Sequence, residues 1–427
     1  MKTLFLLLVF MASLWGDTLP SLISYAKKHS TISKQNQAAL DLAALNRQNA
    51  KAQLFGELNV VGDYTHYNIE RTLAPLVPST IASGEPVTTS KDIYTAGLQY
   101  TVPLFTGFAQ TRQVEIEGIA KKMSQAKNRL STEQLIYNIR SLYLSVLAQK
   151  EMLHAQQRYT KALQKLQKQI AYEVKLGKKA KIDALKASSD VAANKTKEAL
   201  FLANIETTKA TLAALVGKPI SHISTLHIAV KKPHYSIAKL YRKAQALAKV
   251  RVDDLGIQKA QKMIDKSNAS TLPQVNFSGY VGKNYGKDLA TDDWDNETLW
   301  QVGVNVSYNL VDFGKRSIAT QKAKIAKMQA GFQKEQTLLD LKKLLTQGVA
   351  QVKQYYATYR GNQAQYRLAY EAQKIEEVRY NNSASTLNDL LLAKAQAWLA
   401  QAQMIESKYN YQKSKYYINY LMEEGAK

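Results

Sequence analysis

Two long stretches of the chain contain no proline. The eight prolines of the 427 residues leave residues 104–218 and 274–427 free of this helix breaker, and both stretches are rich in helix-forming Ala, Leu, Lys, Gln and Glu. Apolar residues recur in them at heptad-like spacings, at Leu135, Ile139, Leu142, Val146 and Leu153, and at Leu338, Leu341, Leu345, Val349, Val352 and Tyr356. This pattern predicts long helices packed as coiled coils, with rods of about 65 residues and roughly 100 Å.

Four short segments outside the heptad-patterned regions alternate between apolar and polar residues. In residues 299–310, Trp300 and Val302 alternate with Gln301 and Gly303, and similar patterns occupy residues 57–69, 94–102 and 274–282. The lengths suit tilted transmembrane β-strands. Four strands cannot close a barrel, and lipid does not tolerate an open sheet edge, so several copies of the chain must pool their strands if these cross a membrane. A pair of soluble hairpins is the alternative.

The start of the chain has the pattern of a secretory signal peptide. Lys2 precedes an apolar run from Leu4 to Leu14, which is too short for a membrane-spanning helix. A buried N-terminal helix is the alternative. No cysteine is present, which excludes thiolate metal sites, disulfides and a lipid anchor on an N-terminal cysteine. If such an exported chain enters a membrane, it must do so without transmembrane helices.

The charge and the histidines point to no catalytic or nucleic-acid site. The net charge is +24, but the 58 Lys and Arg residues are dispersed along the predicted helices rather than gathered around an aromatic platform. The six histidines form no His-Glu-x-x-His motif, and residues 282–288 are too short for a phosphate-binding loop. We expect no enzyme activity, no catalytic residue, no metal or other cofactor, and no nucleic-acid partner.

The chain repeats itself internally. At an offset of 206 residues, Ile119-Ala120-Lys121 matches Ile325-Ala326-Lys327, and Asp183 matches Asp389. We predict a signal peptide at 1–16 and two repeats, 17–235 and 236–427. The first has a helix, strands at about 57–70 and 91–103, long helices at 104–172 and 178–216, and a connecting segment. The second has a helix, strands at about 274–283 and 298–311, and long helices at 312–380 and 386–423.

This arrangement resembles the TolC-like outer-membrane efflux protein family, also called outer membrane factors. The motifs that carry the resemblance are Thr101-Val-Pro-Leu-Phe-Thr-Gly107, Tyr143-Leu-Ser-Val-Leu-Ala148, Leu176-Gly177, Ala213-Ala-Leu-Val-Gly217 and Leu272-Pro-Gln-Val-Asn276. The resemblance implies an α+β membrane protein. In it, each chain contributes four strands to a trimeric 12-stranded transmembrane β-barrel, and its long antiparallel helices build a coiled-coil tunnel in the periplasm. Residues near 217–240 would join an equatorial belt.

The resemblance also implies a function and partners. The expected protein is a homotrimer in the outer membrane of a Gram-negative bacterium, in contact with outer-membrane lipid. It is expected to serve as the exit duct of a tripartite efflux or type I secretion system. A periplasmic adaptor, or membrane fusion protein, and an inner-membrane RND or ABC transporter would complete the system. The alternative is a non-conducting structural coiled-coil protein of the cell envelope.

The resemblance places the functional residues at two helix–turn–helix tips. Gly177 and Lys178 in the first tip, and Ser383 and Ala384 in the second, would dock the adaptor. Ser383 stands where the family has glycine, although Asn381 and Asn382 beside it could supply a left-handed turn.

The same resemblance predicts a periplasmic gate. Three copies of Asp389 would ring a cation-attracting constriction, and Asp183 with Tyr380 would help to hold the coils shut. Alternatively, both aspartates only cap or solvate the returning helices. The four lysines of the first tip either steer an acidic adaptor or solvate an exposed turn; they are Lys175, Lys178, Lys179 and Lys181.

Overall fold

A computed structural model describes residues 17–84 and 86–425. The predicted signal peptide at 1–16 lies outside the described residues. The described chain is mostly helical, with one four-stranded antiparallel sheet, as the sequence predicted. It divides into two compact units. Of the described residues, the first unit contains 17–38, 126–251 and 335–425, and the second contains 39–84, 86–125 and 252–334.

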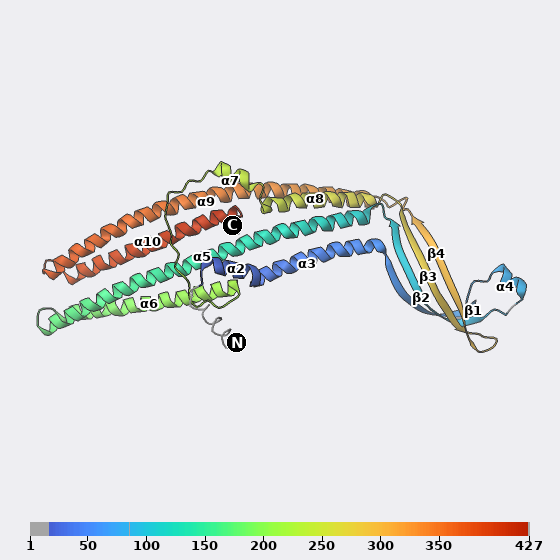
Figure 1. Ribbon diagram of the computed structural model, residues 1–427, viewed down its shortest axis with the longest axis horizontal. Coiled ribbons are helices and arrows are strands. Elements are labelled where there is room, and N and C mark those ends of the chain that lie inside the picture. The colour runs from blue at the N-terminus through green and yellow to red at the C-terminus, as the bar shows by residue number, and fades with distance from the viewer. Residues whose placement is uncertain (1–16, 85, 426–427) are drawn as a thin grey trace, which may run out of the picture. The chain divides into compact units, whose positions relative to one another are not determined.

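The second unit holds the sheet. Its strands are β1 (Glu57–Thr72), β2 (Thr89–Phe105), β3 (Gln274–Lys287) and β4 (Trp294–Ser307), and they pair in the order β1-β2-β3-β4 (Figure 1). The central β2–β3 pair is antiparallel and joins parts of the chain that are far apart in sequence. The sheet therefore depends on a non-local pairing at its centre.

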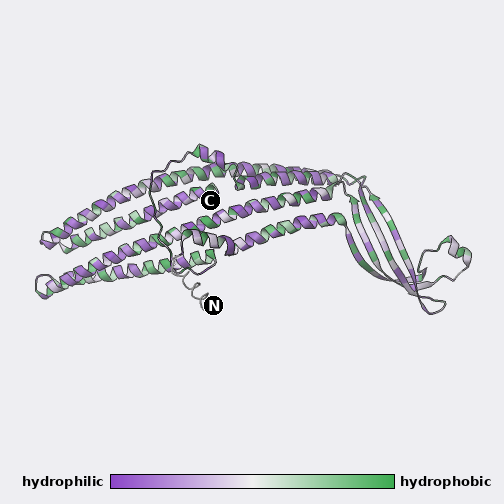
Figure 2. Ribbon diagram, viewed as in Figure 1, coloured by the Kyte–Doolittle hydropathy of each residue, from purple (hydrophilic) through white to green (hydrophobic). Residues whose placement is uncertain are grey.

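The strand register places a row of exposed apolar residues, with members from all four strands, on one face of the sheet. Val60 lies opposite Leu98, Leu98 opposite Val281, and Val281 opposite Trp300. Directly opposed residues of an antiparallel pair point to the same face. Val60 is 85% exposed and Trp300 is 73% exposed. Figure 2 shows the resulting mixture of hydrophobic and hydrophilic residues along the strands. The single chain thus leaves an apolar sheet face uncovered.

The last strand differs from its predicted range of 298–311. It runs from Trp294 to Ser307, and its last pair joins Ser307 to Gln274 of β3. Pro273 precedes that residue and has no backbone N–H to extend the ladder. The alternation in sequence continues to Leu310, but these last residues have no β3 partner, so the prediction of a strand to residue 311 is wrong.

The long helices begin a few residues later than predicted. Helix α5 (Ala109–Lys175) and helix α9 (Lys315–Asn381) each have 67 residues, about 100 Å of helix at 1.5 Å per residue. The left-handed pair Gly107 and Phe108 separates β2 from α5, at φ +60° and +72°. At α9, the Asp312 carboxylate accepts a hydrogen bond from the Arg316 backbone N–H at 2.9 Å. These junctions replace the predicted starts at 104 and 312.

Polar side chains join the helices of the second unit. The Lys262 Nζ of α8 (Ala248–Ala269) lies 2.9 Å from Glu115 Oε2 of α5. Lys266 donates to Gln113 at 2.8 Å in the same helix pair, and Lys327 of α9 donates to Gln261 of α8 at 2.8 Å. Charged and amide groups thus connect these helices near the sheet.

The first unit contains the apolar helix cores. Around α5, the predicted heptad residues Leu135, Ile139 and Val146 are buried with residues of α2 (Leu19–His29) and α6 (Lys181–Val216). In a second cluster, Leu345 and Val352 of α9 pack with residues of α7 (Ile237–Ala244) and α10 (Leu387–Leu421). Helix α3 (Thr31–Ala52) begins in this unit. The heptad pattern therefore identifies real packing positions.

Two tyrosines attach the irregular segment after α6 to the long helices. The Tyr143 hydroxyl of α5 donates to the Ser224 carbonyl at 2.6 Å, and the Tyr411 hydroxyl of α10 donates to the Lys231 carbonyl at 2.5 Å. The Asp17 backbone N–H donates to His222 O at 2.8 Å. This segment is the one for which the family resemblance predicts an equatorial belt.

Helix α6 has the length and composition that would allow a helix to cross a membrane. Only 17% of its most apolar window is buried in the single chain. That helix also carries Glu206 and Lys209, which form an ion pair at 3.1 Å, and it buries Leu212 and Val216 in the core of the first unit. These contacts are those of a packed helix.

Candidate functional site at the helix tips

The two helical hairpins of the first unit end in turns of matching geometry. In the turn from α5 to α6, the Lys178 N–H donates to Glu173 O at 2.9 Å and the Gly177 N–H donates to Val174 O at 3.0 Å (Figure 1). In the turn from α9 to α10, Ala384 donates to Arg379 O at 2.8 Å and Ser383 donates to Tyr380 O at 3.0 Å. Both pairs form a Schellman motif, which satisfies the last carbonyls of a helix.

Each motif needs one residue in the left-handed conformation. In the first tip this residue is Gly177, at φ +72°, and no atom lies within 4 Å of the position that a Cβ would take there. In the second tip the left-handed residue is Ser383, at φ +59°. Asn381 ends α9 and Asn382 does not have a positive φ, so the expectation that an asparagine supplies this conformation is wrong. A Cβ in this region costs roughly 1–2 kcal/mol.

Asp389 caps the first turn of α10. Its carboxylate accepts from the Thr386 backbone N–H at 3.1 Å and from the Thr386 hydroxyl at 2.6 Å. The Asp389 N–H in turn donates to Thr386 Oγ1 at 3.2 Å, which completes a capping box. The hydrogen bond from the Thr386 side chain holds the pKa of the Asp389 carboxyl below its usual value. The exposed Asp389 therefore has a local structural role at this helix start.

Tyr380 is buried among apolar residues from both hairpins. It is 4% exposed and packs with Ile170, Leu387 and Leu390. Its hydroxyl has no hydrogen-bond partner among the residues that the structure describes. Burial raises the Tyr380 pKa, and the nearby Glu173 and Asp183 carboxylates raise it further. The side chain thus provides apolar packing between the hairpins.

The predicted gate pair does not form a direct bond within one chain. Asp183 lies in the first turn of α6, where its backbone N–H donates to Ala180 O at 3.1 Å. Among the described contacts no hydrogen bond joins it to Tyr380; the group that reaches this ring is Lys179, with Nζ 4.7 Å from the ring centroid. Lys179 and Asp183 thus lie near Tyr380, whereas the hydrogen bonds of the Asp389 carboxylate go to Thr386.

The predicted docking residues of both tips are exposed, but their surroundings differ. Gly177 and Lys178 in the first tip and Ser383 and Ala384 in the second are exposed to solvent. Arg379 donates to the Ala384 carbonyl at 3.3 Å and pairs with Glu376 at 3.0 Å. In the first tip, Lys178 has no ion pair with any described residue.

Sequence reasoning missed a basic groove near the tips. It has a volume of about 510 Å³, and its cationic lining residues are Arg158, Lys161 and Lys165 of α5 and Lys394 of α10. The Lys394 side chain is 5% exposed and pairs with Glu377 of α9 at 3.1 Å. The spacing of the α5 cations, three and then four residues apart, is the signal that could have revealed their common helix face.

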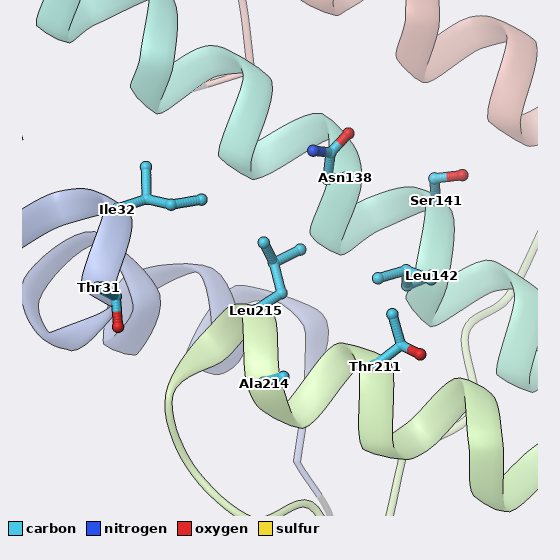
Figure 3. A pocket seen from close by; sticks show the side chains of 8 residues that line it. All are labelled: Thr31, Ile32, Asn138, Ser141, Leu142, Thr211, Ala214 and Leu215. Atoms are coloured by element: carbon cyan, nitrogen blue, oxygen red, sulfur yellow. The ribbon is translucent and has the colours of Figure 1, made fainter.

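A second groove lies between α3, α5 and α6 (Figure 3). It has a volume of about 540 Å³, and it is lined by Thr31, Ile32, Asn138, Ser141, Leu142, Thr211, Ala214 and Leu215. None of these side chains is titratable. Within the described chain, no group of three or more His, Asp or Glu residues is placed to hold a metal ion.

Comparisons with known proteins agree with this architecture. A model of the outer membrane efflux protein family matches residues 22–218 and 242–418. No curated protein matches the chain in sequence. A membrane protein from Pseudomonas aeruginosa has a similar structure, with a TM-score of 0.78 at 14% identity over 95% of this chain and 93% of that one. The outer membrane protein VceC from Vibrio cholerae has a TM-score of 0.75 at 16% identity, over 95% of both chains. The Campylobacter jejuni outer membrane channel CmeC has a TM-score of 0.78 at 16% identity, over 95% of this chain and 86% of that one.

Proposed function

The chain belongs to the TolC-like outer membrane efflux protein family, and we propose that three copies of it form the exit duct of a tripartite efflux or type I secretion system. In this proposal, substrates pass from a periplasmic adaptor and an inner-membrane RND or ABC transporter to the exterior. The duct conducts passively and performs no chemistry on its substrate.

The observation that carries the proposal is the unfinished sheet. In the described chain, β1 pairs only with β2, and β4 pairs only with β3, so both outer edges are open. One face of the sheet bears exposed apolar residues, while the other bears polar ones such as Asn59, Gln99 and Asn305. An outer-membrane sheet of this kind needs closure, because unpaired backbone groups are too costly in lipid.

Pairing β4 of one copy with β1 of the next closes the sheet. Three copies give an even number of 12 strands, and the barrel turns its apolar face to lipid and its polar face to the lumen. Tyr64, Tyr94 and Trp294 lie together near one end of the sheet, with ring centroids 4.8 and 5.6 Å apart. An aromatic cluster at this place suits a membrane interface.

The proposal includes two repeats, 17–235 and 236–427, whose long helices line the periplasmic tunnel. Backbone geometry supports the duplication, since left-handed residues recur 206 positions apart. These pairs are Gly107 and Phe313, Phe108 and Gly314, Gly177 and Ser383, and Gly217 and Glu423. Unrelated segments would have no reason to share this offset at four positions.

The tips are the proposed gate and docking sites. In the trimer, Asp389 would ring the constriction, and Asp183 with Tyr380 would hold the hairpins together. Gly177, Lys178, Ser383 and Ala384 would contact the adaptor. The exposed Asp389 carboxylate, ionised at neutral pH, supports the first role, and the burial of Tyr380 between the hairpins supports the second.

Purified full-length protein tests the proposal directly. We expect threefold-symmetric particles by electron microscopy, a mass three times that of the protomer, and discrete conductance steps in planar bilayers. Trimers that give no conductance would indicate the non-conducting envelope protein instead. Monomers in detergent that retain the helices would contradict both the shared barrel and the duct.

A further inference from the structure

The two tip hairpins differ sharply in charge. We define the first tip hairpin as residues 158–186 and the second tip hairpin as the matching residues 364–392, which are 206 positions later. The first contains nine basic and two acidic side chains, a net charge of +7. The second contains three basic and four acidic side chains, a net charge of −1. Two hairpins with matching turns therefore present very different electrostatic surfaces.

The basic residues of the first tip hairpin are unpaired. None of the nine forms an ion pair with a residue that the structure describes, and all except the half-buried Lys179 are exposed. In the second tip hairpin, by contrast, Lys374 pairs with Glu371 at 3.1 Å and Arg379 pairs with Glu376 at 3.0 Å. The positive charge of the first tip hairpin is thus available to a partner.

The cations of α5 form one continuous stripe. Arg158, Lys161, Lys165 and Lys168 follow each other at spacings of three, four and three residues, which places them on one helix face. Lys175 continues the stripe seven residues further on. From Arg158 to Lys175 the stripe is about 25 Å long at 1.5 Å per residue. That length suits an extended macromolecular surface, whereas a small anion would contact only two or three of these groups.

Exposed apolar side chains accompany the cations at the turn. Tyr172, Leu176 and Ile182 are 64%, 51% and 55% exposed. At the matching places of the second tip hairpin, Val378, also apolar and 60% exposed, stands for Tyr172, whereas the polar Asn382 stands for Leu176 and the polar Asn388 stands for Ile182. A surface that mixes aliphatic groups with unpaired cations favours a folded protein partner, because a flexible polyanion offers no apolar groups to bury.

We propose that the first tip hairpin is the docking surface for an acidic helical protein, namely the acidic tip of the periplasmic adaptor, and that the second tip hairpin contributes little to this attraction. This inference rests on the proposed function for the identity of the partner. Charge complementarity speeds association and selects the partner, and the apolar residues at the turn then hold the complex.

Two synthetic helical hairpins can serve as probes. They share one scaffold and differ only at their tips, where one carries glutamates and the other glutamines. Binding is measured on immobilised full-length protein in lipid nanodiscs. We expect the acidic probe to bind about tenfold more tightly or better, and its advantage to shrink as salt rises from about 0.1 M to about 1 M, where the Debye length falls from about 10 Å to about 3 Å.

A matched pair of double variants identifies the hairpin responsible. K161Q/K168Q removes two cations from the first tip hairpin, and R367Q/K374Q removes the two that lie 206 positions later. We expect K161Q/K168Q to weaken binding of the acidic probe by about three- to tenfold, mainly by slowing association. R367Q/K374Q should leave the affinity unchanged within about twofold, because Lys374 is already paired within its own helix.

Several results would overturn the inference. These are equal affinity for the two probes, an equal loss in the two double variants, or dextran sulfate competing as effectively as the acidic hairpin. The last would show a nonspecific attraction for polyanions rather than docking.

Conductance of the unmodified protein in planar bilayers separates a failure of the docking surface from a failure of the proposed duct. A conducting trimer without preference for the acidic probe refutes only the docking surface, whereas a clear preference without conductance refutes only the duct.

Discussion

Gly177 and Ser383 hold the same left-handed conformation at the ends of two helices, at φ +72° and +59°. They are 206 residues apart, and each donates its backbone N–H to the carbonyl three residues before it, at 3.0 Å in both tips. The second tip therefore keeps the turn geometry of the first without its glycine. The Cβ of Ser383 adds strain that Gly177 avoids.

Ser383→Gly should stabilise the second tip. Removal of the strained Cβ is expected to raise the free energy of unfolding by about 0.5–1 kcal/mol. This is a net value, because the greater freedom of glycine in the unfolded chain offsets part of the gain. Thermal unfolding of the purified protein, followed by circular dichroism, measures the change. Gly177→Ser should act in the opposite direction. Ala384→Gly is the control, because Ala384 does not have a positive φ, and a gain of stability there would contradict the explanation.

Asp389→Asn should make the protein less sensitive to acid. The hydrogen bond from Thr386 lowers the pKa of the folded Asp389 carboxyl, so its ionised form stabilises the folded state above the ordinary value of about 3.9. This contribution is lost as pH falls through the lower, folded pKa. We therefore expect the melting temperature of the unmodified protein to fall further below about pH 4 than that of the variant. Thermal unfolding scans over a range of pH measure both.

The same residue allows capping to be separated from gating. Thr386→Ala removes the helix cap, at a cost of about 1 kcal/mol, but keeps the charge of Asp389. Reversal potentials in a salt gradient measure cation selectivity. If Asp389 rings the constriction, selectivity falls in Asp389→Asn and stays in Thr386→Ala. Unchanged selectivity in both would leave Asp389 with its capping role alone.

Val304→Arg should weaken the membrane sheet. Val304 is 60% exposed and lies opposite Phe277 on the apolar face. In the proposed barrel this face meets lipid, where an arginine costs roughly 2–4 kcal/mol at the bilayer midplane and less toward the interfaces. Asn305→Arg is the matched control, since the adjacent residue points to the polar face. We expect fewer heat-stable trimers on semi-native gels for the first variant only. Equal losses would contradict the assignment of the two faces.

Tyr143→Phe should reduce the loss of stability in alkali. Burial raises the pKa of Tyr143 to about 12, so its neutral form stabilises the folded state fully below the ordinary value of about 10 and less as pH rises toward 12. At neutral pH the variant should lose about 1 kcal/mol with the hydrogen bond to Ser224. Unfolding scans from pH 7 upward test both effects. Tyr172→Phe, at an exposed position, should change neither.

Much of the fold was readable from local patterns. Heptad spacing identified the residues that pack, as with Ile139 and Val352, both of which are 0% exposed. Period-2 alternation identified strands with one apolar face, because successive side chains of a strand always point to opposite sides. At the tips, Gly177 was recognisable because a glycine between two helical patterns is typical of a left-handed turn.

Other features depend on neighbours that local patterns do not reveal. Nothing in the serine at 383 shows a positive φ; the helices on either side impose it. The Asp389 capping box was open as an alternative, and its geometry came only with the position of Thr386. The basic groove that contains Lys394 depends on three helices meeting, so the sequence indicated only its stripe on α5.

Periodicity and short motifs in the amino-acid sequence are enough to identify the long helices, the two faces of the strands and the family of the chain. Three-dimensional packing is needed to establish where β4 stops, which tyrosines hold the segment after α6, and which lysines remain unpaired. These depend on residues far apart in the chain, such as Gln274 with Ser307 and Tyr411 with Lys231. Their hydrogen bonds and ion pairs form only when packing has brought the partners within reach.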